Sequence, residues 1–161
     1  MASERAAALA DDFAAANADA LRFTRSCSET EWALTVPGEG WTVGVVLHHI
    51  AEGHAHGARW VREMATGEGV TESAADIDRA NAAHAVREEA VGRAETVTLL
   101  ELNGGRLEAV LRALSDQELD RTAPFGPAGG TALPAADLAA VAARHTREHL
   151  AHVAKAVGQE P

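Results

Sequence analysis

The C-terminal part of the chain repeats its apolar residues in steps of three and four, which is the spacing of one face of an α-helix. Leu138 and Val141 begin this stripe, and His145 and His149 continue it as far as Val153. An imidazole on a buried helix face needs a partner, because an unpaired polar group is costly to bury. The stripe therefore predicts a packed helical domain with a specific site where the two histidines point inward.

Helical spacing and cap residues predict the remaining elements. The first helix is expected over about residues 3–25 with Ser3 as its N-cap, the second from the cap Thr42 to about Met64, a short one after Thr71 or Ser73 to about Ala85, and a further long one at the capping box of Thr98 and Glu101. The last helix is expected from Pro134 to about Val157.

The composition agrees with this pattern, since 47% of residues are hydrophobic but only 4% are aromatic, and alanine occurs in runs. Gly104 and Gly105 lie inside a predicted helix and indicate close approach by a neighbour or a ligand, because glycine weakens a helix interior. We predict an all-α fold, a four-helix bundle with one additional short helix, in which residues 1–161 form a single domain.

The net charge limits the possible binding partners of the protein, and the N-terminus and cysteine content indicate its cellular location. The net charge of −10 opposes binding to a phosphate backbone, so no nucleic-acid partner is expected. Cys27 is the single cysteine, a weak candidate nucleophile with no basic neighbour beyond Arg25. A polar N-terminus without a signal peptide predicts a cytoplasmic protein, and no apolar run approaches the ~18 residues of a membrane span.

Three of the eight histidines are predicted to hold one divalent metal ion. His145 and His149 are four residues apart on one helix face, about 5–6 Å at Cβ, so both can direct a nitrogen at one ion. His48 and His49 differ by about 100° around their helix, and the buried stripe selects His49 as the third ligand. Imidazoles suit zinc, nickel, copper and iron; zinc is the first expectation and nickel the second.

Other polar residues are placed around this site. His56 lies two turns beyond His49, roughly 10 Å by helical rise, and is expected in the wall of the site. Glu52, one turn after His49, can orient an imidazole by accepting a hydrogen bond. His152 supports a ligand, faces the substrate or is solvated. The remaining pair, His54 and His84, is interpreted as surface or satisfied core.

Three motifs follow one another along most of the chain: Trp41-Thr42 with His49-Ile50, Ile77-Asp78 with Asn81-Ala82, and His145-x-x-x-His149-Leu150. In this order they resemble the DinB/YfiT-like superfamily, which includes mycothiol-dependent maleylpyruvate isomerases and bacillithiol transferases. The resemblance implies a four-helix bundle with three metal ligands, which map onto His49, His145 and His149. His145 stands where the isomerase branch commonly has Glu, so the thiol-transferase or uncharacterised branches are favoured.

The leading functional hypothesis is transfer of a low-molecular-weight thiol such as mycothiol, ionised on the metal, to a small-molecule electrophile. Metal-assisted hydrolysis or isomerisation is the second candidate. A non-catalytic metal- or ligand-binding bundle in a homodimer is the third. The residues expected to move protons or orient ligands are His152, His56 and Glu52, and those expected to bind substrate at the pocket mouth are Asp78, Arg79 and Asn81.

Overall fold

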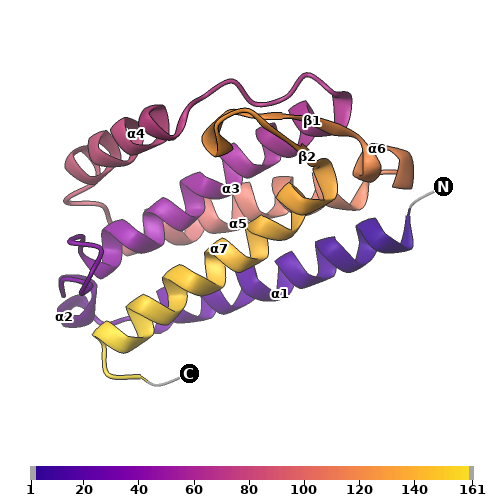
Figure 1. The fold of residues 1–161 in the computed structure, drawn as a ribbon. Coiled ribbons are helices and arrows are strands. Elements are labelled where there is room, and N and C mark those ends of the chain that lie inside the picture. Colours follow the sequence, from indigo (N-terminus) through magenta and orange to yellow (C-terminus); the bar gives the residue numbers. More distant parts are fainter. Residues whose placement is uncertain (1–2, 160–161) are drawn as a thin grey trace.

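The computed structural model describes residues 3–159, which form seven α-helices, one 3-10 helix and a two-stranded antiparallel sheet (Figure 1). The elements in chain order are α1 (Glu4–Ser26), α2 (Glu29–Trp32), α3 (Val43–Thr66), α4 (Ala74–Arg87), α5 (Arg93–Arg112), α6 (Asp116–Asp120), β1 (Thr122–Phe125), η1 (Gly126–Ala128), β2 (Thr131–Pro134) and α7 (Ala135–Ala156).

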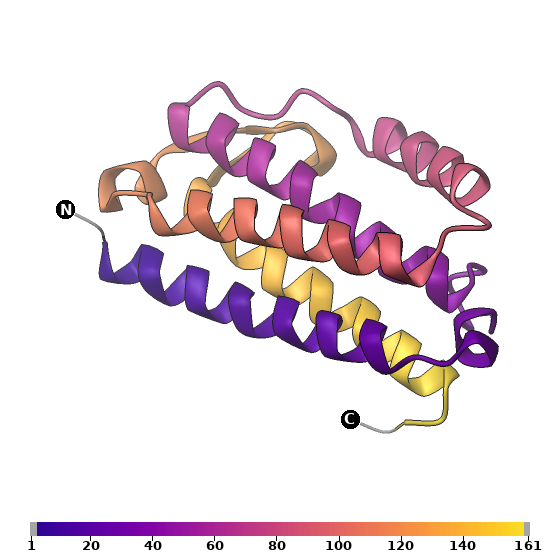
Figure 2. The same cartoon turned by 180° about the vertical axis from the view of Figure 1, so that it is seen from behind.

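The four long helices α1, α3, α5 and α7 form the bundle. Neighbours around it follow the order α1, α5, α3, α7. α1 and α7 run in one direction and α3 and α5 in the other, while α4 lies outside α3 on the connection that returns to α5 (Figures 1 and 2). The predicted four-helix bundle is confirmed. Within residues 3–159, no helix combines the length and apolarity that a membrane span needs.

Most helix starts follow the predicted cap residues. The side chains of Ser3, Thr42 and Ser73 accept hydrogen bonds from the first turns of α1, α3 and α4. The capping box predicted at Thr98 is wrong, because α5 already begins at Arg93. The Thr98 hydroxyl instead donates to the carbonyl of Ala94, four residues back inside the same helix.

The proline- and glycine-rich connection before α7 forms more structure than the sequence predicts. β1 and β2 pair as an antiparallel hairpin, and Gly129 and Gly130 turn the chain with φ of 68° and 82°. Pro134 is the N-cap of α7 rather than its first residue, because its backbone is extended with ψ of 145°. The hairpin fixes where α7 begins, and therefore also the position of the α7 histidines along the bundle.

The interior has an apolar cluster at each end of the bundle, the first containing Phe13 and the second Leu47. Buried polar groups lie between them: Asn17 binds His54 at 3.0 Å between Oδ1 and Nε2 and donates to the Leu100 carbonyl at 3.3 Å. His54 is therefore the satisfied core residue that the sequence predicts. Gly104 faces Asn17, where a Cβ would collide with the amide.

Candidate metal centre

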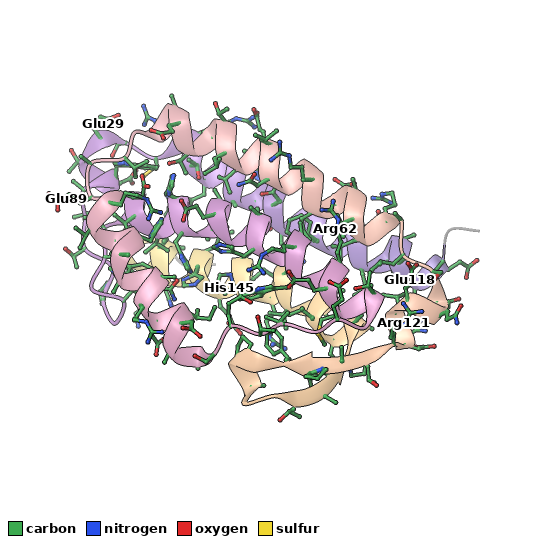
Figure 3. The ribbon with its side chains drawn as sticks, turned by 90° about the horizontal axis from the view of Figure 1, so that it is seen from above. Glu29, Arg62, Glu89, Glu118, Arg121 and His145 are labelled. Atoms are coloured by element: carbon green, nitrogen blue, oxygen red, sulfur yellow. The ribbon has the colours of Figure 1, made fainter. Side chains whose placement is uncertain are left out.

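α7 supplies two of the three imidazoles. His145 and His149, one helical turn apart, lie with their Nε2 atoms 3.1 Å from each other. Two zinc–nitrogen bonds of about 2.1 Å can span at most roughly 4.2 Å, so one ion can bond to both atoms. Figure 3 places His145 near the middle of the bundle, whereas Glu29 and Glu118 lie at its two ends. His145 is thus in the middle of the bundle, and His149 lies one turn further along α7.

His49 reaches the same point from α3. The ligand atoms of His49, His145 and His149 all lie within 4.8 Å of one another. The ring of His49 packs edge-on against Trp41, with ring centroids 5.2 Å apart. The structure therefore brings together the three histidines that the sequence selects; metal binding by these rings stays a prediction.

Gly53 allows α3 and α7 to approach each other at this point. A Cβ at Gly53 would lie 3.6 Å from Cε1 of His145, already in van der Waals contact. Any longer side chain at Gly53, one turn after His49, would therefore push the His145 ring away. The small residue has a structural purpose next to the imidazoles.

Burial keeps the imidazoles of His49 and His145 neutral. Desolvation, with His149 and His145 acting in the same direction, lowers the pKa of His49 to about 3. Desolvation, followed by the neighbouring His149, lowers the pKa of His145 to about 4. A neutral imidazole keeps one nitrogen lone pair free, and three such ligands leave the full charge of a divalent ion uncompensated. The donor set therefore fits a divalent metal of the zinc type.

Glu39, in the loop before α3, holds the outer side of the cluster. Its Oε1 accepts hydrogen bonds from Nδ1 of His149 at 2.9 Å and from Nδ1 of His152 at 2.7 Å. Burial alone would raise the pKa of the Glu39 carboxyl, but these two hydrogen bonds lower it below its usual value. Because Nδ1 of His149 donates to Glu39, the Nε2 lone pair points toward His145, as in the carboxylate–histidine–metal arrangement of zinc enzymes.

Sequence reasoning missed Glu39. It lies between Gly38 and Gly40, whose φ values of 87° and 74° turn the loop toward α7. An acidic residue between two glycines, in a loop too long for a tight turn, is the signal that the sequence offered. That signal carries no helical or strand period, so it does not say which element the carboxylate faces.

A pocket of about 520 Å³ lies between α3, α4 and α5. It meets the imidazole cluster at His49 and Gly53. Its lining residues are His49, Glu52, Gly53, Ala55, His56, Ala80, Asn81, Ala83, His84, Arg87, Leu99 and Asn103. Both His56, which is exposed and stacks on Trp60 at 6.1 Å between ring centroids, and Asn81 line this pocket; their roles stay predictions.

Two predicted substrate-binding residues lie elsewhere. Asp78 and Arg79 are exposed and are not among the residues that line the pocket, and Arg79 forms an ion pair with Asp76 on the same helix. The pocket side of α4 runs instead through His84 and Arg87. The helix that carries the motif lines the pocket, but Asp78 and Arg79 are not on the side that lines it, and their substrate-binding role stays a prediction.

The partners of Glu52 lie on α4. Its two carboxylate oxygens accept hydrogen bonds from Nη2 of Arg87 at 3.0 and 3.2 Å, and Oε2 lies 3.9 Å from Nε2 of His84. The hydrogen bonds of Glu52 within residues 3–159 therefore go to α4 rather than to His49. α4 lies close enough to α3 for Arg87 to form an ion pair with this carboxylate.

The prediction that only His49 of the adjacent pair is buried is wrong. His48 is 3% exposed, because α4 covers the neighbouring face of α3. Its Nδ1 lies 3.0 Å from Nε2 of His84, and the two rings stack with centroids 5.2 Å apart. His84 is equally buried, and this burial lowers its pKa. It is also not fully satisfied, since within residues 3–159 its Nδ1 has no hydrogen-bond partner.

The family model of the DinB superfamily matches residues 12–153, which include α3, α4 and nearly all of α7. The chain belongs to the DinB superfamily. The resemblance seen in the Trp41-Thr42, Ile77-Asp78 and His145-x-x-x-His149 motifs is thereby confirmed. A search of curated protein sequences finds no match to this DinB-superfamily chain.

Two solved structures share the fold of this DinB-superfamily chain. YfiT from Bacillus subtilis, described as a probable metal-dependent hydrolase with an unusual four-helix bundle topology, aligns with a TM-score of 0.79 and 18% identity over 99% of this chain and 91% of YfiT. A mycothiol-dependent maleylpyruvate isomerase aligns with a TM-score of 0.71 and 19% identity over 93% of this chain and 59% of the isomerase. At such identities the likeness is one of fold, and function has to be argued from the site.

Proposed function

We propose that this protein is a divalent-metal-dependent enzyme that transfers a low-molecular-weight thiol, such as mycothiol, to a small-molecule electrophile. The observation that carries the proposal is the convergence of His49, His145 and His149 beside a pocket, with Glu39 behind His149. Zinc is the expected ion and nickel the alternative. Once bound by three neutral imidazoles, the ion would lower the pKa of a thiol at its open coordination position.

The protein's own residues hold that ligand set in place. Glu39 fixes the tautomer and the orientation of His149, and Gly53 leaves the room that His145 occupies. His152 is exposed and hydrogen-bonded to the same Glu39 oxygen, so it offers a path for a proton between Glu39 and solvent. In the transfer, a sulfur–carbon bond forms, and the leaving group departs with the thiol proton.

The pocket supports attack by a nucleophile that is ionised beforehand. Glu52 is the one carboxylate among its lining residues, and Arg87 occupies both of its oxygens. Among residues 3–159, the pocket therefore has no carboxylate outside an ion pair to deprotonate a nucleophile. A thiol, with a pKa near 8.5, ionises far more easily than water does. We assign His56 to proton exchange with solvent and Asn81 to hydrogen bonding with the substrate.

A second candidate is hydrolysis by a water molecule activated at the same ion. It is supported by the fold shared with YfiT over nearly the whole length of both chains, and by the description of YfiT as a probable metal-dependent hydrolase. Both candidates need the same three histidines. They differ in whether the reaction consumes a thiol. The homodimer predicted for the non-catalytic alternative is checked by light scattering during size exclusion.

The proposal is tested in two stages. The protein is purified without a nickel column, and its metal content is measured by elemental analysis for the wild type and for His149→Ala. We expect a bound ion at the three-histidine site that His149→Ala removes. Consumption of mycothiol with monobromobimane as electrophile is then followed, and we expect at least a hundredfold loss of rate in His149→Ala or after chelation.

Glutathione and cysteine in place of mycothiol report thiol selectivity. Glu148→Gln is the matched surface control, because Glu148 lies next to His149 on α7 but is exposed and pairs only with Arg144 among the described residues. If the protein hydrolyses an ester or amide in the absence of any thiol, the hydrolase hypothesis is supported and the transferase hypothesis is rejected. A protein that retains no metal when offered zinc would overturn both.

A further inference from the structure

A second group of metal-ligating side chains lies beside the first, on the α4 side of α3. The ligand atoms of His48, Glu52 and His84 lie within 4.8 Å of one another. We propose that these three residues form a second divalent-cation site, separate from the one at His49, His145 and His149. The proposal goes beyond the proposed function, since the thiol transfer needs only the first ion.

The distances repeat those of the first cluster. Nδ1 of His48 and Nε2 of His84 are 3.0 Å apart, against 3.1 Å between the Nε2 atoms of the α7 pair. Oε2 of Glu52 lies 3.9 Å from Nε2 of His84. Each of these separations is within the roughly 4.2 Å that two metal–ligand bonds of about 2.1 Å can span. One ion can therefore bond to both imidazoles, and the carboxylate of Glu52 lies within 4.8 Å of both of their ligand atoms.

The helices present these residues in a pattern suited to a metal. His48 and Glu52 are four residues apart on one face of α3, and α4 brings His84 against them. Both imidazoles are 3% exposed, so they are held by the packing of α4 on α3. Two histidines and one carboxylate form a donor set found for zinc and for iron.

The local charge favours a cation. Glu88 lies 3.9 Å from Nε2 of His48, on the side of the ring opposite the proposed ion, as Glu39 lies behind His149. Glu52 and Glu88 carry two negative charges, and Arg87, which pairs with both, carries one positive charge. A carboxylate offers about four lone-pair sites, so Glu52 can bind Arg87 and an ion at the same time.

A histidine pair joined only by a hydrogen bond explains the geometry less well. If Nδ1 of His48 donates, neutral His84 carries its proton on Nδ1, which is buried without an acceptor. If Nε2 of His84 donates, its Nδ1 becomes a buried acceptor without a donor. Nδ1 of His84 is unpaired in each tautomer and also when an ion binds Nε2, but coordination offsets this cost with a bond to each ring, whereas the pair alone gains one hydrogen bond.

The second site would lie in the wall of the pocket, because Glu52 and His84 both line it. The rings of His49 and His84 are 5.5 Å apart between centroids, so one side chain of each site touches the other. A cation at His48, Glu52 and His84 would present its open position to a polar group of the bound molecule. We expect a carboxylate or another anionic oxygen there, since such groups bind divalent cations.

The test is metal stoichiometry in four proteins. Metal-free wild type, His84→Gln, His149→Ala and the double variant are loaded with zinc, desalted and analysed for zinc per chain. We expect two equivalents, one, one and none. Circular dichroism checks that each variant is folded. Loading with cobalt(II) gives a second readout, because the two ligand sets should give separable visible absorption.

Glu52→Gln covers the case in which His84→Gln does not fold, since Glu52 is partly exposed. We expect this variant to bind the second equivalent at least tenfold more weakly, while Glu63→Gln, on the same helix and paired with Arg59, leaves it unchanged. The second site is overturned if the wild type binds one equivalent of zinc, His84→Gln retains it and His149→Ala loses it. If the wild type binds one equivalent of zinc and only His84→Gln loses it, the second site is supported and the proposed function is contradicted.

Discussion

The carboxylate of Glu39 holds the ring of His149 across 110 residues of sequence, with Nδ1 of the imidazole 2.9 Å from Oε1. The contact joins the loop before α3 to α7, and α3 and α7 supply the three imidazoles. It also decides which nitrogen of His149 has a free lone pair. A loop residue thus controls a helix residue at the candidate metal centre.

Replacing Glu39 by Gln should therefore weaken metal binding with little loss of fold. The amide still fills the space but no longer favours the Nδ1–H tautomer as an ionised carboxylate does, so we expect a loss of affinity of about 10–100-fold. Competition with a chromogenic zinc chelator measures it. Glu148→Gln, which removes the same charge on the surface of α7, should change the affinity less than twofold. Equal affinity in Glu39→Gln and wild type would contradict the role of this carboxylate.

His54 makes the metal-free protein sensitive to acid. Burial, followed by the influence of His145, lowers the pKa of His54 to about 3, below the usual 6.5. The unfolded chain then binds more protons than the folded one as pH falls through about 6.5, so the free energy of unfolding decreases over this window. For one such histidine the slope reaches about 1.4 kcal/mol per pH unit.

We expect urea unfolding of the chelator-treated protein between pH 6.5 and 5 to show this loss. His54→Gln, which keeps an amide to pair with Asn17, should reduce the slope by about 1 kcal/mol per pH unit. The window lies above the range in which the ion-paired carboxylates titrate, so histidines dominate it. An unchanged slope in His54→Gln would show that His54 is not buried in the neutral form.

Gly104 and Gly105 should respond oppositely to alanine. A Cβ at Gly104 would collide with the Asn17 amide and disturb its hydrogen bonds to Leu100 and His54, so we expect a loss of about 1–3 kcal/mol in unfolding free energy. A Cβ at Gly105 meets no atom within 4 Å, so Gly105→Ala should gain about 0.5–1 kcal/mol from helix propensity. Denaturant unfolding of the two variants gives the comparison.

Cys27 should be unreactive in the folded protein. It is 2% exposed, and burial, followed by Glu31, raises the pKa of its thiol to about 11. Reaction with Ellman's reagent at pH 8 should be on the order of a hundredfold slower than in guanidinium, because little thiolate forms. Cys27→Ser should also keep any thiol-transfer activity. A large loss of activity in this variant would point to a cysteine nucleophile instead of a metal.

The sequence predicts the long helices well because their signals are local. The hydroxyls of Ser3 and Thr42 cap the helices that begin after them, so these residues predict the helix starts. The apolar stripe through His145 and His149 predicts which residues face the interior, and these two do meet there. Thr98 shows the limit of that logic: a capping motif inside a helix looks the same as one at its start. The hairpin was missed because its strands are short and lie among prolines and glycines.

The parts of the site that escaped prediction depend on contacts between distant segments. Helical phase selected His49 over His48 on the assumption that α3 has one buried face, but α4 buries a second face. Glu39 has no periodicity to place it. The partners of Glu52 on α4 could not be predicted, because neither helix's own sequence gives the distance between α3 and α4.

α3 contributes consecutive residues, His48 and His49, to two different clusters. A rotation of α3 about its axis, or a shift in its register, therefore displaces a ring in each cluster at once. α4 and α7 each supply side chains to only one of them. Evolution or design can adjust either centre independently through those outer helices, whereas any repacking beneath α3 changes both together.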